Sequence, residues 1–381
     1  MLKHPLQTEL DAFFKAFASG EGRQVTKSAF SQARKKFKHT AFIELNDDQV
    51  SYFYNHFAPD TWHSFRLLAI DGTMATLPNN EAIGGHFGYW HPQAGGRCPK
   101  ARISQLFDVL NKISVDARIA PKDRGERDLA NEHLVHLRAN DLVLLDRGYP
   151  AFWLFSAIRG TGAHFCSRMS LQEWKVVKRF LVSGLREQIV EIEPAYSAKK
   201  ACKERGLSQA PIPVRLLRIE LSNGQTEVLA TSLLDQARYP YELFKELYIQ
   251  RWPIEEDYKA MKSRLEIENW SGESVESVRQ DFHATFFAKN LAAILAQPAQ
   301  HEVQEQSAHK KYTYKVNMTH LYGQLKMTIV KLFTAANPLK LLRILWHHMT
   351  KTIEPIRPNR SNPRKKRVSR LRYPKNYKSI P

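Results

Sequence analysis

Two short apolar runs, each leading into an aspartate, constrain the fold of this chain more than any other feature. FRLLAI at 65–70 leads into Asp71, and DLVLL at 141–145 leads into Asp146. Short apolar runs bounded by turn residues are typical of strands that a sheet buries on both faces. A glycine follows each aspartate within two residues and favours a turn there. We therefore expect an α/β core in which two buried strands each end in a carboxylate.

The segments around these runs fill out the same core. We expect strands at 103–111, 113–120 and 163–168, and helices at 126–137 and 150–158. From 169 to 233 the pattern changes to apolar runs rich in β-formers and separated by turns: WKVVKRFLV, EQIVEIE, PVRLLRIEL and TEVLATSLL. We interpret this segment as a β-rich insertion.

Helical regions are expected on both sides of the core. Apolar residues recur with helical spacing at 7–18, and Thr26 can cap a second helix. In that second helix we expect Phe30, Ala33 and Phe37 to face inward and Arg34, Lys35, Lys36 and Lys38 to form a basic flank. Two helices with a basic flank are compatible with a helix-turn-helix-like DNA reader, although many small bundles share this pattern.

The C-terminal part is predicted to hold helices at 274–296, 318–335 and 338–349, with a polar linker at 297–312. Four parts follow from these patterns. They are a helical DNA-binding region at 1–62, the core at 63–290 with its insertion at 169–233, a helical region at 291–354, and a basic, proline-containing tail at 355–381.

The charge of the chain points to a polyanionic partner. The net charge is +19, and ten of the cations lie between Arg357 and Lys378, where there is no acidic residue. Without those ten the chain still carries +9. The tail is expected to be extended or disordered until it meets a partner. No apolar run approaches the ~18 residues of a spanning helix, and the first residues show no signal peptide, so nucleic acid is favoured over a membrane.

The spacing of the cysteines indicates neither a disulfide framework nor a metal site. Cys98, Cys166 and Cys202 have neither paired nor metal-ligand spacing. A reduced intracellular compartment is therefore expected.

The segment YIQRWPIEEDYKAMK at 248–262 concentrates chemistry on one helical face. Its members are Tyr248, Arg251, Glu255, Lys259 and Lys262, which fall within an arc of about 80° at roughly 100° per residue. Proline is tolerated at the first helical position, which predicts one helix over about 240–252 and a second from 253 to about 265. The segment alone also fits an ordinary amphipathic helix with a basic outer face.

Asp71, Asp146 and Glu255 can together form a metal site. In open α/β sheets, sites form at the carboxyl ends of strands. Phosphoryl transfer on DNA uses two Mg²⁺ ions about 3.5–4 Å apart, and Mg²⁺ prefers oxygen ligands. Asp71 would lie between the metals, with Asp146 and Glu255 on either side. Taken singly, each aspartate could equally be a turn residue or a helix cap.

The cations of the 248–262 face suit a phosphate backbone rather than a metal. Arg251 offers a two-point fork, Lys262 a point charge and Tyr248 a hydroxyl. Arg168 and Lys100 are further candidates for phosphate contacts. His133 and His136 share a helix face but lack a third soft ligand, so packing or surface roles are expected for them. No GxxxxGK[ST] motif is present, which argues against a P-loop ATPase.

The spacing Tyr-x2-Arg-x3-Glu-x6-Lys in this segment resembles the signature of the DDE transposases of the insertion-sequence-4 family. LLAIDGT and DLVLLDRGYP resemble the other two catalytic motifs of that family, and the likeness extends over about 29–291. The resemblance implies a ribonuclease-H-like mixed sheet flanked by helices and interrupted by the β-rich insertion. It makes Asp71, Asp146 and Glu255 the catalytic carboxylates, with two Mg²⁺ or Mn²⁺ ions as cofactors.

The resemblance also implies a function and partners. The protein would cut double-stranded DNA at the ends of its own element and join those ends to target DNA, with two subunits bridging two ends. Its location would be the prokaryotic cytoplasm, in association with the nucleoid. Two alternatives stay open: a catalytically idle DNA-binding descendant of such an enzyme, and a plain metal-dependent nuclease. All three carboxylates are present, which favours an active enzyme.

Overall fold

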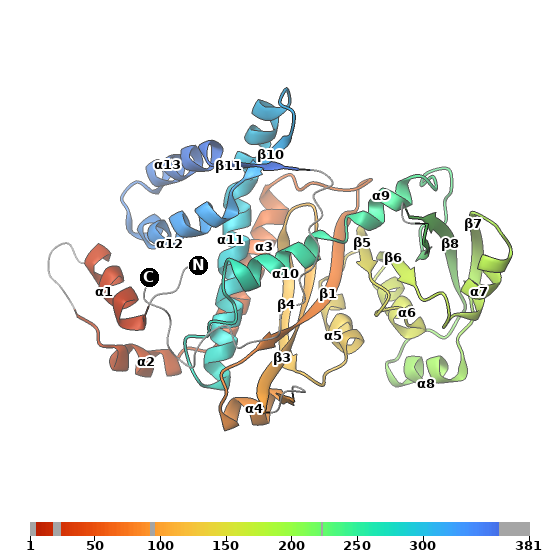
Figure 1. Cartoon of the computed structure of the whole chain (residues 1–381), viewed down its shortest axis with the longest axis horizontal. Helices are drawn as coiled ribbons and strands as arrows, with labels where there is room; N and C mark the ends of the chain where they lie inside the picture. The colour runs from red at the N-terminus through yellow and green to blue at the C-terminus, as the bar shows by residue number, and fades with distance from the viewer. Residues whose placement is uncertain (1–4, 18–23, 92–95, 222–223, 358–381) are drawn as a thin grey trace. The chain divides into compact units, whose positions relative to one another are not determined.

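The computed structural model describes residues 5–17, 24–91, 96–221 and 224–357, and these form two compact units (Figure 1). Unit 1 comprises Met1–Phe57, Ala75–Ala101 and Lys259–Pro381, and unit 2 comprises Ala58–Met74 and Arg102–Tyr258. In the part of the chain described, no helix is long and apolar enough to cross a membrane.

A mixed sheet forms the body of unit 2. Its strands are β1 (Arg66–Thr76), β3 (Cys98–Asp108), β4 (Ile113–Pro121), β5 (Asp141–Leu145), β6 (His164–Met169), β7 (Glu187–Ile192), β8 (Ile212–Glu220) and β9 (Thr226–Thr231). The order runs β3-β1-β5-β6-β9-β8-β7, with β4 on the outer side of β3. β1, β5 and β6 are parallel, whereas β6, β9, β8 and β7 pair antiparallel. The series β4-β3-β1-β5-β6 is the arrangement expected of a ribonuclease-H-like core, which confirms the predicted fold class.

The pairing of β1 with β5 sets the geometry at the centre of this sheet. Residues 67–70 and 142–145 are completely buried, as their apolar sequences predict. At the amino end of the pair, Arg66 donates from Nε and Nη2 to both oxygens of Asp141, at 2.8 and 2.7 Å. Arg66 also donates to the carbonyl oxygen of His136, at 3.0 Å. This buried fork lies at the residue pair where the register of the two strands begins.

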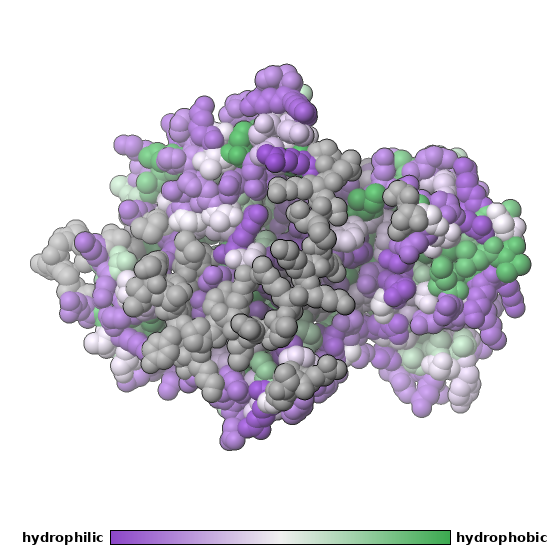
Figure 2. All heavy atoms as spheres, viewed as in Figure 1, coloured by the Kyte–Doolittle hydropathy of each residue, from purple (hydrophilic) through white to green (hydrophobic). Residues whose placement is uncertain are grey.

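The insertion extends the same sheet, because its strand β9 pairs with β6. One part of the prediction was wrong: WKVVKRFLV is the helix α7 (Lys175–Val182), not a strand. Val177 and Phe180 are buried three residues apart, a helical spacing that overrides the β-branched composition of the run. The helix α8 (Tyr196–Glu204) was not anticipated. Figure 2 shows apolar surface over α7 and β7, where the large exposed residues are Val182, Leu185 and Ile189.

The remaining helices of unit 2 follow the predictions closely. They are α5 (Glu126–His133), the 3-10 helix η1 (Leu134–His136), α6 (Phe152–Gly160), α9 (Leu243–Ile249) and the first part of α10 (Pro253–Ser263). α10 begins at Pro253, as the tolerance of proline at a first helical position predicts.

Unit 1 is mainly helical. It contains α1 (Leu6–Phe17), α2 (Lys27–Lys35), α3 (Thr40–His56), α4 (Glu81–Phe87), α11 (Val275–Ser307), α12 (Met318–Thr334) and α13 (Pro338–Lys351), with the short strands β2 (Tyr89–Trp90), β10 (Thr313–Val316) and β11 (Ile353–Ile356). α11 contacts α3, α4, α12 and α13 and is the element on which this unit is built. Sequence reasoning did not anticipate α3.

The N-terminal helices confirm one expectation and correct another. The Thr26 hydroxyl caps α2 by accepting from the backbone of Ala29, as predicted. Arg34, expected on an exposed basic flank, instead donates to Gln280, Asp281 and Ser271 beside α11. Phe37, expected to face inward, is 44% exposed. Residues 18–23, between these two helices, lie outside the described residues.

The C-terminal predictions need two corrections. α11 continues to Ser307 through Pro298, so the predicted linker at 297–312 is mostly helix, and the boundary predicted at 290/291 falls inside α11. A proline inside a helix costs roughly 3 kcal/mol, but Ala299, Val303 and Ser307 beyond it are buried at four-residue spacing. Pro355, expected to start the tail, lies in β11 opposite Tyr314. The tail from 358 onward lies outside the described residues.

Candidate active site

Asp71 and Asp146 occupy neighbouring positions on adjacent strands. The last aligned pair of β1 and β5 is Ile70 with Leu145, so the two aspartates follow in the next register position. Adjacent strands lie about 4.8 Å apart. β5 ends at Leu145, as predicted, but β1 does not end at Asp71 and continues to Thr76. Asp71 therefore lies within a strand and Asp146 in the loop that follows one.

The loop after β5 fixes the Asp146 carboxylate. Its Oδ1 accepts the backbone N–H of Gly148 at 2.8 Å, an aspartate turn of the ordinary kind. A side-chain carbon on Gly148 would lie 3.2 Å from that same oxygen, so the turn suits a glycine. Asp146 therefore does act as a turn residue, as its sequence context allowed, and it also lies beside Asp71.

Two residues near Glu255 have different roles, since Arg251 bonds the Glu255 carboxylate and Tyr258 anchors the helix that carries it. Arg251, which is only 7% exposed, donates from Nη2 to Glu255 Oε1 at 2.8 Å across one helical turn. Three residues further along α10, the Tyr258 hydroxyl donates to the backbone oxygen of Asp71 at 2.8 Å. A hydrogen bond thus attaches α10, the helix that carries Glu255, directly to Asp71 of β1.

The three carboxylates share one electrostatic environment. The pKa of Asp71 is raised to about 6, chiefly by burial, and the charges of Asp146 and Glu255 also raise it. A backbone hydrogen bond from Gly72 and the charge of Arg251 act in the opposite direction. Excess negative charge therefore gathers around a partly buried carboxyl group.

The three carboxylates are suitable ligands for a divalent cation, but their side chains are not grouped closely enough to surround one. All three donors are carboxylate oxygens, which Mg²⁺ prefers, and a cation would offset the charge that raises the pKa of Asp71. Among the described residues, no three acidic, histidine or cysteine side chains gather closely enough to hold a metal. Asp146 and Glu255 are turned to Gly148 and Arg251 instead. A cation would have to bind the second oxygen of each carboxylate or displace these partners.

Other predicted residues of unit 2 lie around the same strand ends. The Tyr248 hydroxyl lies 3.4 Å from the backbone oxygen of Leu145, and its pKa is raised, chiefly by burial. Arg168, at the end of β6, is ion-paired with Glu227 of β9 at 2.9 Å. Arg168 and Arg147 also line a polar pocket of about 420 Å³, and sequence reasoning had not singled out Arg147.

The predicted lysines belong to unit 1. The Lys100 ammonium lies 3.9 Å from the centre of the Trp90 ring. Burial lowers the pKa of Lys262, with the charge of Glu268 acting to raise it and that of Lys100 to lower it. Lys259 is exposed. The contacts of these lysines with DNA stay predictions.

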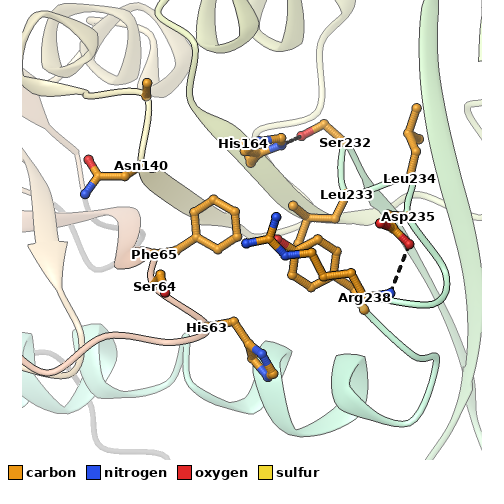
Figure 3. Close-up of a pocket in the computed structure, with 12 residues that line it drawn as sticks. His63, Ser64, Phe65, Asn140, His164, Ser232, Leu233, Leu234, Asp235 and Arg238 are labelled. Atoms are coloured by element: carbon orange, nitrogen blue, oxygen red, sulfur yellow. Dashed lines mark hydrogen bonds between the residues drawn. The ribbon is translucent and has the colours of Figure 1, made fainter.

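A different part of unit 2 holds a pocket of about 480 Å³ (Figure 3). Phe65, Asn140 and His164 line it, and these residues precede or begin β1, β5 and β6. Figure 3 shows Arg238 among the residues facing this pocket and His164 hydrogen-bonded to Ser232, at 3.1 Å. None of the three carboxylates lines it. The pocket therefore lies at the amino ends of the parallel strands, whereas Asp71 and Asp146 lie toward their carboxyl ends.

Sequence reasoning missed two tyrosines of the carboxylate site. Tyr258 anchors α10 to Asp71, and Tyr149 is buried beside Gly72. Tyr149 belongs to the motif DLVLLDRGYP, but nothing in a loop sequence shows which way such a side chain turns. Tyr258 lies three residues from Glu255, close to its helical face, and that spacing was the available signal.

Comparison with known proteins identifies the family. A family model described as "Transposase DDE domain" matches residues 62–291, more than half of the 381-residue chain. The transposase InsG for insertion sequence element IS4 of Escherichia coli (strain K12) is 25% identical over 273 residues, which are 70% of this chain and 60% of that protein. The transposase for insertion sequence element IS231D of Bacillus thuringiensis subsp. finitimus is 20% identical over 290 residues, 65% of this chain and 59% of that protein.

A further relative is the putative transposase y4zB of Sinorhizobium fredii, 27% identical over 199 residues, which cover 52% of this chain and 51% of that protein. The chain thus spans about half to three-fifths of the length of these curated relatives. Among solved structures, the cryo-EM structure of the piggyBac transposase synaptic complex with hairpin DNA matches with a TM-score of 0.44 and 10% identity, over 89% of this chain and 67% of that one. On the extent of the family-model match, this chain belongs to the family of transposase DDE domains.

Proposed function

We propose that this protein is the DNA transposase of an insertion sequence and that unit 2 carries its phosphoryl-transfer site. The register of β1 and β5 carries the proposal, because it puts Asp71 beside Asp146, and Tyr258 attaches the Glu255 helix to Asp71. Membership of the DDE transposase family supports the reaction class, and the insertion-sequence relatives support the biological role.

Asp71, Asp146 and Glu255 would hold two divalent cations, Mg²⁺ or Mn²⁺. Such ions, when bound, activate the attacking oxygen and stabilise the leaving oxygen of a phosphodiester. The protein must supply ionised carboxylates at the working pH. A pKa of about 6 leaves Asp71 mostly ionised at neutral pH. Glu255 would exchange its bond with Arg251 for a cation.

The cations and the tyrosine hydroxyl that the sequence nominates would hold the DNA. Arg251, once released by Glu255, has a planar fork that suits a phosphate, and Tyr248 adds a hydroxyl. Arg168, Lys100, Lys259 and Lys262 would contact the backbone. The proposed sequence begins with water attack at an element end, which frees a 3′-hydroxyl that then attacks target DNA. Two subunits would bridge two ends of double-stranded DNA, in the nucleoid of a prokaryotic cytoplasm.

Cleavage and strand joining by the purified full chain test this function. The substrate is duplex DNA that carries the terminal inverted repeats flanking the gene, with Mg²⁺ or Mn²⁺ present. We expect Asp71→Asn, Asp146→Asn and Glu255→Gln to reduce cleavage by at least a hundredfold while the variants stay folded and keep binding DNA. Asp123→Asn is the matched control, because Asp123 is an exposed carboxylate paired with Lys122.

The outcomes separate the alternatives. Cleavage that persists in Glu255→Gln would remove Glu255 from the site. DNA binding by the wild-type protein with no cleavage in either metal would indicate a catalytically idle DNA-binding protein. Cleavage without strand joining would indicate a nuclease.

A further inference from the structure

We propose that Gln105 and Asp257 are a positioning pair of the active site. Their hydrogen bond fixes how α10 is turned about its own axis, and with it the direction in which Glu255 points. The inference rests on the proposed function, which gives Glu255 its part in the reaction.

Gln105 on β3 is the cross-strand neighbour of Asp71 on β1. Two backbone hydrogen bonds, both of 3.0 Å, join these strands near their opposite ends: the Val109 N–H to the Leu67 oxygen, and the Leu77 N–H to the Pro99 oxygen. Both bonds fit one antiparallel register without a bulge, and that register puts Gln105 directly opposite Asp71. Side chains of directly opposite residues project from the same face of a sheet, with β-carbons about 4.5–5.5 Å apart. Gln105 therefore shares the sheet face of the first aspartate.

Consecutive residues of α10 bond to these two neighbours (Figure 1). Gln105 donates from Nε2 to Asp257 Oδ2 at 3.1 Å, which joins the helix to β3. The Tyr258 hydroxyl donates to the backbone oxygen of Asp71 at 2.8 Å, which joins the helix to β1. A single bond would let α10 turn about the point of attachment. Two bonds to adjacent strands fix how the helix is turned.

The way in which α10 is turned decides where the Glu255 carboxylate lies. Ile254 and Tyr258, one helical turn apart, are buried and mark the side of the helix that packs inward. At about 100° per residue, Glu255 and Asp257 lie on opposite flanks of that side. The charge of Glu255 is among those that raise the pKa of Asp71, so the Glu255 flank is the one near that aspartate. A bond that holds the Asp257 flank to β3 keeps Glu255 on this side.

Stability alone does not explain a polar pair at this place. Gln105 is 0% exposed, and its Oε1 is a buried acceptor without a hydrogen-bond partner among the residues that the structure describes. Apolar residues of similar volume are often as stabilising as a buried polar pair, and more so where one polar atom stays unsatisfied. A buried polar pair can nevertheless select one arrangement of packed elements over others. Gln105 and Asp257 are suited to that use, because they join the helix of Glu255 to the strand beside Asp71.

The experiment replaces the pair by apolar residues in the full chain. We expect the double variant Gln105→Met/Asp257→Leu to melt near the wild-type temperature, because methionine and leucine fill the space without an unsatisfied atom. Its cleavage of saturating element-end DNA should fall at least tenfold, while its affinity for that DNA stays within twofold of the wild type. Gln105→Met alone should melt below the double variant, because it leaves the Asp257 carboxylate without this donor.

Asp257→Asn is the conservative control. Asparagine keeps an oxygen that accepts the hydrogen bond from Gln105 and removes only the charge. We expect its cleavage to stay within about threefold of the wild type, in contrast to Glu255→Gln. Cleavage lost as fully in Asp257→Asn as in Glu255→Gln would assign Asp257 to the reacting atoms and overturn its positioning role.

The double variant decides the rest. Wild-type cleavage by it would show that the pair does not place Glu255, and a melting temperature far below the wild type would make the pair an ordinary support of the fold. If the wild type itself does not cleave DNA, the proposed function fails, and crystal structures of the two proteins still test the pair. The inference then requires Glu255 to be displaced in the double variant, and an unmoved Glu255 would overturn it.

Discussion

At the scale of single residues, Asp71 carries the clearest pH dependence. Its pKa in the folded protein is about 6, against an ordinary value of 3.8. Folding therefore favours the protonated form. The stability that this gives is fully present below about pH 4 and is lost as the pH rises through about 6. In a metal-free protein at neutral pH, the ionised Asp71 should be a destabilising group.

Asp71→Asn tests this by removing the charge while keeping the shape. In chelator at pH 7.5, we expect the variant to be more stable to urea than the wild type. The gain should be at most about 3 kcal/mol, since a pKa difference of one corresponds to about 1.4 kcal/mol, and solvent around the partly exposed side chain reduces it. At pH 4 the two proteins should be equally stable. A variant destabilised to the same extent at both pH values would contradict the raised pKa.

Arg251 gives a second residue-scale prediction. It could have been a surface cation of little consequence, but the structure shows it buried and bonded to Glu255. Lysine keeps the charge and loses the planar fork. We expect Arg251→Lys to lower cleavage at least tenfold, because a lysine cannot hold a phosphate at two points.

A melting curve and end-binding measurements beside the cleavage time course separate this effect from unfolding. Arg124→Lys, at an exposed arginine that is ion-paired with Glu132, is the control for the same change of cation type. Wild-type cleavage by Arg251→Lys would mean that neither the contact with Glu255 nor a phosphate clamp matters for the reaction.

At the scale of elements, the buried fork between Arg66 and Asp141 holds the register on which the site depends. Both side chains are almost fully buried, and the first aligned pair of β1 and β5 is this pair. Removing one partner of a buried ion pair costs about 3–5 kcal/mol, because the other charge is left uncompensated. We expect Asp141→Ala to lose stability of that order in urea unfolding, whereas Asp123→Ala should change it by less than about 0.5 kcal/mol. A loss as small as that of the control would show that solvent reaches Arg66.

Some elements could be predicted from the sequence because local and tertiary signals agree. The apolar runs before Asp71 and Asp146 are strands, and Pro253 begins α10, as their local sequences indicate. The segment 175–182 was wrongly predicted as a strand, because its β-branched residues fit a strand while its burial follows helical spacing. At Pro298 the sequence predicted the start of a linker, but packing of the residues beyond it keeps α11 continuous. In both cases burial decided against local propensity.

The site shows the same division. Spacing could nominate Asp71, Asp146 and Glu255, because strand ends and a helical face are visible in a sequence. It could not show that Arg251 would bond Glu255 or that Tyr149 would turn its hydroxyl inward. Those details depend on contacts between β1, the loop after β5 and α10, which are far apart along the chain.

At the scale of the whole molecule, the charge of the chain exceeds what the carboxylate site needs. The net charge is +19, and ten cations lie between Arg357 and Lys378 without an acidic residue. A cluster of this kind displaces counterions from any duplex and reads no sequence. We expect the tail to add affinity for specific and random DNA alike. Each phosphate contact adds about 0.9 to the slope of log K against log salt on duplex DNA.

Deleting residues 357–381 from the full chain should therefore flatten the salt dependence of binding to element-end and random duplexes by the same amount. Even half of the ten cations in contact would lower the slope by about 4 to 5. The ratio of the two affinities should stay unchanged, and cleavage should recover at low salt, because Asp71, Asp146 and Glu255 are retained. Equal slopes before and after deletion would make the tail a solubilising segment. A change in the affinity ratio would instead assign it a part in recognising the element ends.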